Sequence, residues 1–222
     1  MNGENMANTL KEYFASVEKT REPNIPVGAV RVKPCKSENF EISTFEVDEK
    51  KAKFFNLQMI MNRQNRFIRP GTYTQIVGKG HGIMMSNTPA EIGDHMEFYY
   101  AATGRVMIGG LGIGMILEAV LKKPEVTSIT IIEKEQEIID LVSPFYANEE
   151  KVKIICGDVF TPQDCITQGT KFDRLYFDIW DTICADNYPE MKDLNLKWRK
   201  YKAPGGKAYF WEKAICKREY FE

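Results

Sequence analysis

The segment GRVMIGGLGIGMILEAVLKK, residues 104–123, constrains the fold of this chain more than any other stretch. A short apolar run is followed by a glycine-rich turn and then by residues with helical spacing of apolar side chains. Glycines in such a turn let the backbone approach a ligand closely, because no Cβ atom stands in the way. The pattern therefore predicts a strand, a turn and a helix, with Gly109, Gly110, Gly112 and Gly114 as ligand-binding positions.

Further apolar runs follow this segment and alternate with helical patterns. The runs occupy residues 105–109, 128–133, 152–156, 174–180 and 207–213. The first three are continuous rather than alternating, as expected of strands that are covered on both faces, and the intervening helices favour right-handed βαβ units. We therefore predict an α/β fold with a Rossmann-like parallel sheet over residues 96–222, in which a helix over 187–202 is ended by PGG before the last strand.

The first 95 residues show a different pattern of apolar residues and turns, which predicts a small β-rich N-terminal region with helices. Residues 40–47 read as a strand, and residues 72–86 as a hairpin that turns at GKGHG. Between them, residues 48–64 have helical spacing, with Asp48 available as the N-cap. We expect two units, residues 1–95 and 96–222.

Composition excludes several classes of function. The net charge is −1, from 30 Lys and Arg against 31 Asp and Glu, so no overall field favours nucleic acid or a membrane surface. No apolar run approaches the ~18 residues of a membrane span, and MNGENMANTLKEYF lacks the layout of a signal peptide. The five cysteines form no CxxC pair and there are two histidines, which predicts a cytoplasmic protein with neither disulfides nor a metal site.

The ends of the predicted strands indicate the ligand. The glycines follow G-x-G-x-G from Gly110 to Gly114, whereas a dinucleotide fingerprint would place its third glycine or alanine at Met115. Glu133 ends the second run, where a carboxylate can accept hydrogen bonds from both ribose hydroxyls. Asp158 ends the third and can accept from an adenine amine, with Val159 and Phe160 as an apolar wall. Each feature alone has a structural explanation; together they favour an adenosine-containing ligand.

Residues 70–181 resemble the class I S-adenosylmethionine-dependent methyltransferase superfamily, and within it the spermidine-synthase-like branch. The resemblance lies in the hairpin and the segment GIMMSNTPAEIGDHMEFYY, in VMIGGLGIGMILEAVLK, in ITIIEKEQEIIDLV, in GDVF and in DIWD. It implies a class I methyltransferase sheet. As a departure from that pattern, we expect the antiparallel strand pair that normally completes the sheet to be shortened or absent, because few residues follow KAYFWEK. The resemblance also implies S-adenosylmethionine, or its decarboxylated form, as the cofactor.

Two departures from that branch bear on the reaction. The acidic residue that helps the polyamine synthases select decarboxylated S-adenosylmethionine is replaced by Gly112, and the proline usual after the second aspartate of DIWD is missing. Methyl transfer to an amine or other small nucleophile is therefore favoured. A polyamine aminopropyltransferase and a non-catalytic adenosyl-ligand-binding protein stay open as alternatives.

Asp178 and Asp181 are the predicted catalytic residues, because the resemblance places an acid–base residue in DIWD and two carboxylates can orient an amine and take its proton. Trp180 could wall the pocket that holds a cationic group. The remaining predicted substrate residues are Tyr73, Gln75, Asp94 and His95, which would form the opposite wall. We expect the carboxylate of Asp94 to raise the pKa of His95.

The expected partners are a small-molecule acceptor and a second copy of the chain, because exposed sheet edges favour pairing. No membrane partner is expected. The segment LKWRKYK, residues 196–202, interleaves four basic residues with Trp198 and Tyr201 and could contact nucleic acid, although a solvated helix face explains it better.

Overall fold

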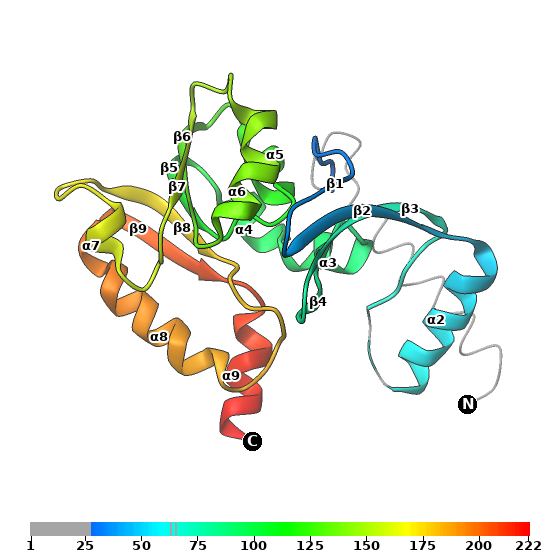
Figure 1. Ribbon diagram of the computed structural model, residues 1–222. Helices are drawn as coiled ribbons and strands as arrows, with labels where there is room; N and C mark the ends of the chain where they lie inside the picture. The colour runs from blue at the N-terminus through cyan, green and yellow to red at the C-terminus, as the bar shows by residue number, and fades with distance from the viewer. Residues whose placement is uncertain (1–27, 63, 65) are drawn as a thin grey trace.

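The computed structural model describes residues 28–62, 64 and 66–222, and two sheets organise them (Figure 1). The expected absence of a signal peptide concerns residues that lie outside this part of the chain. The antiparallel sheet has the order β1-β2-β3-β4, with β1 Cys35–Lys36, β2 Phe40–Val47, β3 Gly71–Gly78 and β4 Gly82–Ser86. Among the described residues, no helix combines the length and the apolar character that a membrane span requires.

The second sheet is parallel throughout, with the order β7-β6-β5-β8-β9. Its strands are β5 Gly104–Gly109, β6 Val126–Glu133, β7 Val152–Cys156, β8 Phe172–Phe177 and β9 Lys202–Phe210. Numbered along the chain, the order is 3-2-1-4-5, which is that of a Rossmann-like sheet. The predicted fold class is confirmed. Within the described residues the sheet ends at β9, with no antiparallel strand beside it.

Helices cover both faces of the parallel sheet (Figure 1). One face packs against α4 Met96–Ala101, α5 Met115–Leu121 and α6 Gln136–Val142, which the 3-10 helix η1 Ser143–Tyr146 extends. The other packs against α8 Asn187–Lys197, the 3-10 helix η2 Trp198–Tyr201 and α9 Lys213–Phe221, with the short α7 Pro162–Cys165 nearby. The middle of β5 is fully buried between these layers, which accounts for its continuous apolar sequence.

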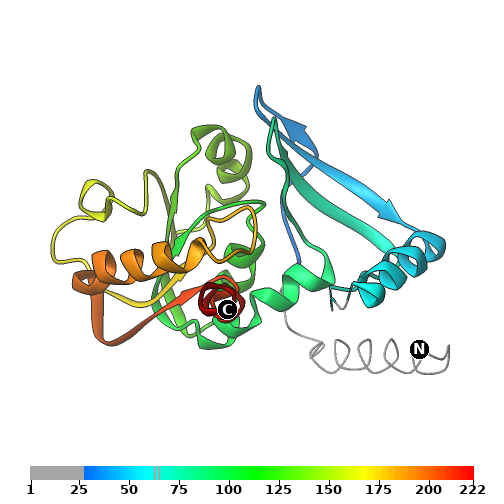
Figure 2. The ribbon, with the colours of Figure 1, turned by 90° about the horizontal axis from the view of Figure 1, so that it is seen from below.

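The antiparallel sheet lies beside the parallel sheet, and α3 Pro89–Asp94 and α4 connect the two along the chain (Figure 2). The predicted hairpin is β3 and β4, with its turn at residues 79–81. The predicted helix is α2 Glu49–Met61, and the carboxylate of Asp48 accepts a hydrogen bond from the backbone N–H of Lys51 at 2.7 Å, as a capping residue does. Ile42 and Ile76 of this sheet pack into the same hydrophobic core as α5 and α6.

The C-terminal part differs from the prediction. α8 ends at Lys197, and β9 begins at Lys202, so PGG lies inside the strand instead of before it. The strand accommodates PGG as a bulge, because its register with β8 jumps from Phe172↔Lys202 to Arg174↔Lys207. Helix α9 was not predicted, since its sequence continues a run that reads as a strand.

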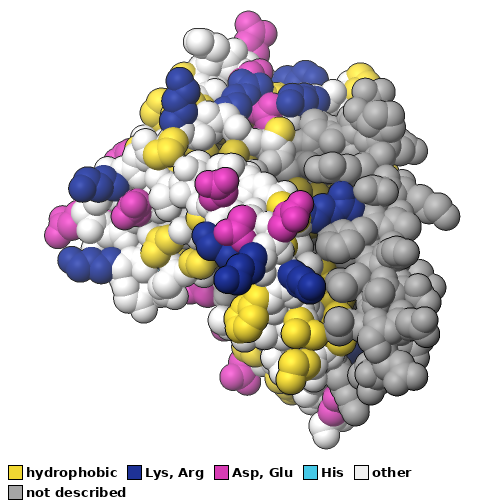
Figure 3. Space-filling view, turned by 90° about the vertical axis from the view of Figure 1, so that its right-hand side faces the viewer, with side chains coloured by type: hydrophobic (Ala, Val, Ile, Leu, Met, Phe, Trp, Pro, Cys, Tyr) yellow, Lys and Arg dark blue, Asp and Glu magenta, His cyan; other side chains and the backbone are white. Residues whose placement is uncertain are grey.

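The aromatic residues of LKWRKYK belong to the core. Trp198 is 0% exposed and Tyr201 is 3% exposed, so neither can stack on a nucleobase. The indole N–H of Trp198 instead donates to the backbone carbonyl of Val159 at 2.8 Å. A different face of the molecule, shown in Figure 3, carries basic and acidic side chains interspersed. The aromatic residues of this segment are therefore not available for contact with nucleic acid, the alternative that the sequence did not favour.

Candidate functional site

The carboxyl ends of the parallel strands and the antiparallel sheet enclose a cleft with a volume of about 330 Å³. Ligands of open α/β sheets bind at this end of the strands. Eight of the predicted site residues line the cleft: Gly110, Gly112, Glu133, Asp158, Val159, Asp178, Trp180 and Asp181. They come from the ends of four strands, so the sheet topology assembles them.

The glycine turn crosses the end of the neighbouring strand β8. Gly110 has a φ of +93°, and a Cβ atom at this position would lie 2.1 Å from the backbone oxygen of Asp178. Any side chain at residue 110 would therefore push the turn away from β8. Gly109 ends β5 and Gly114 is the N-cap of α5; they flank the turn and do not line the cleft.

Glu133 joins the end of β6 to the glycine turn. One carboxylate oxygen accepts from the backbone N–H of Leu111 at 2.8 Å, and the other from the N–H of Glu135 at 2.9 Å. Glu133 is 7% exposed, and burial raises the pKa of its carboxyl despite these two N–H donors. A carboxylate offers about four lone-pair sites, so beside the backbone donors of Leu111, Glu135 and Lys134 it can still accept from a ligand hydroxyl.

Asp158 follows β7 and is held in a local turn. Its Oδ1 accepts from the backbone N–H of Phe160 at 2.8 Å, while Oδ2 lies 3.6 Å from the ammonium of Lys134. Val159 is 5% exposed and Phe160 also lines the cleft. The end of β7 thus presents one carboxylate beside an apolar and aromatic surface, as predicted for the wall beside an adenine ring.

Asp178 directly follows β8 and lies deep in the cleft, with a side chain that is 9% exposed. Burial and the nearby carboxylates of Glu91, Asp94 and Glu133 raise its pKa to about 8. The ionised form of a carboxyl with a pKa of about 8 is a stronger base than an ordinary aspartate, and its share of the molecules grows as the pH approaches 8. The surroundings of Asp178 therefore suit it to accept a proton from a substrate.

Asp181 and Trp180 occupy the mouth of the cleft instead of its floor. The carboxylate of Asp181 lies 3.3 Å from Nδ1 of His81, and its side chain is 45% exposed. The indole N–H of Trp180 donates to Glu190 at 2.7 Å. Asp178 and Asp181 thus lie in different environments, one buried and one solvated, and Asp178 has the surroundings of a proton acceptor.

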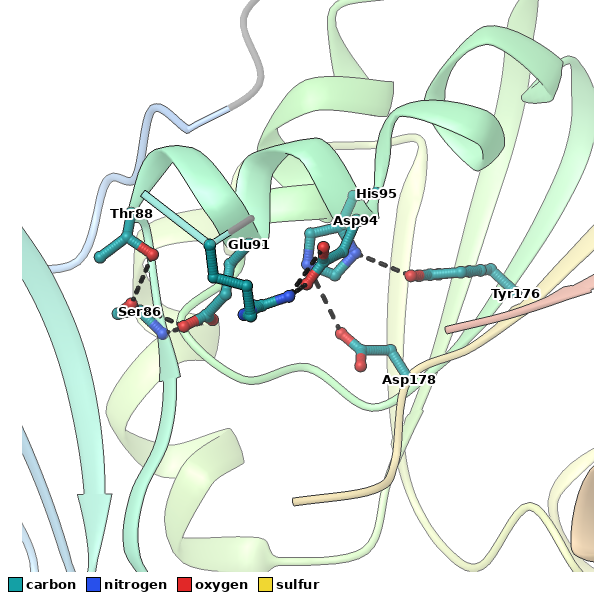
Figure 4. Close-up of polar contacts among 8 residues, drawn as sticks. Ser86, Thr88, Glu91, Asp94, His95, Tyr176 and Asp178 are labelled. Atoms are coloured by element: carbon teal, nitrogen blue, oxygen red, sulfur yellow. Dashed lines mark hydrogen bonds and ion pairs between the residues drawn. The ribbon is translucent and has the colours of Figure 1, made fainter. Parts of the chain in front are cut away.

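His95 and Asp94 lie behind Asp178 and do not line the cleft. The sequence-based expectation for the His95 pKa was wrong: Asp94 does raise it, but burial outweighs that effect and lowers it to about 4. Both oxygens of Asp94 accept from Nη1 of Arg66, at 3.0 and 2.8 Å. Figure 4 shows the His95 ring between Tyr176 and Asp178.

Tyr73 and Gln75 do not form the opposite wall of the cleft, which corrects the expectation for both. Ile76 lines the cleft, and side chains alternate along a strand, so residues 73 and 75 point to the other face of β3. The hydroxyl of Tyr73 donates to the backbone oxygen of Arg69 at 2.9 Å, and the amide of Gln75 donates to Ser43 at 3.3 Å. Both side chains bond within the N-terminal region.

The opposite wall is apolar and was not predicted. Phe40, Ile76, Met84 and Met85 face the parallel sheet across the cleft. The sulfur of Met85 would lie 2.5 Å from a Cβ atom at Gly112, whose φ is +50°. Met85 therefore packs directly against the glycine turn at Gly112. The described residues hold no group of His, Cys, Asp or Glu side chains arranged to bind a metal.

No protein-family model and no curated protein sequence matches this chain. Among solved structures, it is similar to the fibrillarin pre-rRNA processing protein of Methanococcus jannaschii (19% identity, TM-score 0.40), over 48% of this chain and 44% of that one. It is also similar to Aeropyrum pernix fibrillarin with natively bound S-adenosyl-L-methionine (16%, 0.39, 47% and 43%) and to YcgJ of Bacillus subtilis (16%, 0.41, 52% and 48%). The chain thus spans less than half the length of each. Likenesses this partial assign no activity.

Proposed function

We propose that this chain is an S-adenosylmethionine-dependent methyltransferase that acts on an amine or another small nucleophile. The observation that carries the proposal is the joint placement of Glu133, Asp158 and Asp178 around one cleft, beside a glycine turn. A dinucleotide is disfavoured, since the turn lacks the third glycine of the fingerprint that holds a pyrophosphate.

The residues present fit an adenosyl group. The carboxylate of Glu133 has acceptor capacity left for a ribose hydroxyl, and Asp158 can accept from the adenine amine while Val159 and Phe160 cover the ring. Gly110 and Gly112 bring the backbone of the turn to the cleft, where the methionine part would lie. S-adenosylmethionine supplies a sulfonium, whose attached carbons are already activated toward nucleophiles.

The chain's own contribution is to position the acceptor and to remove its proton. Asp178 lies on the floor of the cleft and is the residue that takes this proton, as a raised pKa favours. The wall of Phe40, Met84 and Met85 excludes water from the acceptor and holds it near Asp178. Asp181, with His81 and Trp180, borders the entrance.

Aminopropyl transfer is the alternative that DIWD favours, and Gly112 with Met85 argues against it. Calorimetric titrations with S-adenosylmethionine, its decarboxylated form, methylthioadenosine and NAD separate the alternatives. We expect S-adenosylmethionine to bind more tightly than the decarboxylated form. The reverse order would restore the aminopropyltransferase, and binding of NAD alone would refute the adenosyl site.

A further inference from the structure

His95 lies next to both Tyr176 and Asp178. Of these three residues, Asp178 lines the cleft and the other two do not. Tyr176 and Asp178 are two residues apart at the end of β8, so their side chains project to the same side. The His95 ring, between α3 and α4, meets them edge-on to Tyr176. Its Nδ1 lies 2.7 Å from the Tyr176 hydroxyl, and its Nε2 lies 3.8 Å from Oδ2 of Asp178 (Figure 4).

The hydroxyl and the ring are sealed from water. His95 is 1% exposed and Tyr176 is 2% exposed. Phe98 covers the face of the Tyr176 ring, with 4.4 Å between the ring centroids and an interplanar angle of 8°. Buried polar groups must find partners within the protein, so the protons of Tyr176 and His95 are confined to the two contacts just described.

The direction of the hydrogen bond between Tyr176 and His95 determines which ring nitrogen of His95 carries the proton. Burial keeps the Tyr176 phenol protonated, since it raises the pKa well above its usual value, and burial keeps His95 neutral. In the described part of the chain, the Tyr176 hydroxyl contacts no acceptor other than Nδ1 of His95. A phenol that donates to Nδ1 leaves the ring proton on Nε2, which faces Oδ2 of Asp178.

We propose that His95, fixed by Tyr176, is a positioning residue for Asp178: its Nε2–H donates to Oδ2 and leaves Oδ1 directed to the cleft. Nε2 and Oδ2 lie 3.8 Å apart, so the proposed hydrogen bond requires the two groups to approach each other further. The proposal rests on the proposed function only for the role of Asp178 as the proton acceptor.

Other charged groups surround this trio and enter any titration. Asp178 faces Glu91, Asp94 and Glu133. His95 faces Asp94 and Arg66, and Tyr176 faces Asp178, Asp94, Glu97 and Glu212. Substitutions that leave all of these carboxylates in place therefore isolate the effect of the contacts of His95 with Tyr176 and Asp178.

The test is the tautomer of His95, read from ring nitrogen chemical shifts in protein labelled with nitrogen-15 and measured without ligand. The chain has only two histidines, so His81→Gln assigns the signals. We expect His95 to carry its proton on Nε2 at pH 7. A ring protonated on Nδ1, or on both nitrogens, at that pH would overturn the proposal.

Tyr176→Phe supplies the second measurement, since it removes only the hydroxyl and keeps the stacking on Phe98. We expect the proton of His95 to redistribute toward Nδ1, and the carboxyl of Asp178 to titrate about one pH unit higher, because its charged form loses a donor. An unchanged tautomer and an unchanged Asp178 titration would each contradict the proposal. Both readouts are independent of S-adenosylmethionine binding, so a failed adenosyl site and a failed His95 assignment are distinguishable.

Discussion

A Cβ atom added to Gly110 would lie 2.1 Å from the backbone oxygen of Asp178. The turn that is proposed to hold the cofactor and the residue that is proposed to take the proton are therefore in backbone contact. The backbone N–H of Asp178 also donates to the carbonyl of Gly109 at 2.9 Å. A change at the turn must consequently move the candidate base.

Gly110→Ala tests this contact through stability. We expect a loss of roughly 2–4 kcal/mol in the free energy of unfolding, from the positive φ (about 1–2 kcal/mol) together with the overlap. Gly80→Ala is the matched control, since Gly80 has a φ of +83° with nothing within 4 Å of its Cβ position. Urea denaturation measures both variants. Equal losses would mean that the turn and β8 are not in close contact.

Glu133→Gln should weaken binding of S-adenosylmethionine by about tenfold or more, equivalent to ~1.4 kcal/mol. The amide group would place a donor against the N–H of Leu111 or of Glu135, where the carboxylate accepted. Glu135→Gln makes the same charge change at an exposed residue of the same cleft and should leave affinity nearly unchanged. Titration calorimetry compares the two, with melting temperatures to monitor folding. A similar effect of both substitutions would remove Glu133 from the ribose site.

The raised pKa of Asp178 predicts how stability depends on pH. Between its ordinary value of 3.8 and about 8, the folded protein retains a proton that the unfolded chain has lost. The folded state then binds more protons, so this group lowers stability as pH rises through that window. Asp178→Asn should remove this contribution, and the variant should gain stability relative to the wild type between pH 5 and pH 8.5.

Denaturation midpoints at the two pH values measure this difference. Asp181→Asn is the control, because its carboxylate is solvated at the mouth of the cleft. The carboxyl of Glu212, whose pKa burial and Asp94 raise to about 7, contributes equally to all three proteins. A gain for Asp178→Asn that shrinks with increasing pH would contradict the assignment of a raised pKa.

Arg31 forms ion pairs between the N-terminal region and residues in and near the helices that cover the parallel sheet. Its replacement should lower the free energy of unfolding. Its guanidinium lies 2.5 Å from Glu118, whose side chain is 5% exposed, and 2.5 Å from Glu149. Arg31→Gln leaves Glu118 with Lys122 alone and should destabilise the fold by roughly 1–2 kcal/mol. Arg105→Gln, which breaks the exposed pair with Asp173, should cost clearly less. Urea denaturation ranks the two; the opposite ranking would refute the link.

Local sequence patterns were enough to predict the strand ends of the site. Gly110, Glu133, Asp158 and Asp178 each follow an apolar run, and the topology of a parallel sheet brings such positions to one edge. Strand alternation alone could also have excluded Tyr73 and Gln75: the apolar Ile76 faces the core, so residues of odd number on β3 face away.

The remaining parts of the site depend on contacts between distant segments. His95 meets Tyr176 across 81 residues, and Met85 covers Gly112 across the cleft between two sheets. The spacing of apolar residues within a segment does not indicate which distant segment it will contact. The same packing buries His95. Burial lowers the pKa of His95, whereas its neighbour Asp94 alone would raise it.

The most direct test of the account is the structure of this protein crystallised with S-adenosylmethionine. We predict ribose hydroxyls on the carboxylate of Glu133, the adenine beside Asp158 and Phe160, and the methyl group directed toward Asp178. A ligand bound outside the cleft, or reversed so that the adenine lies at Asp178, would contradict the account.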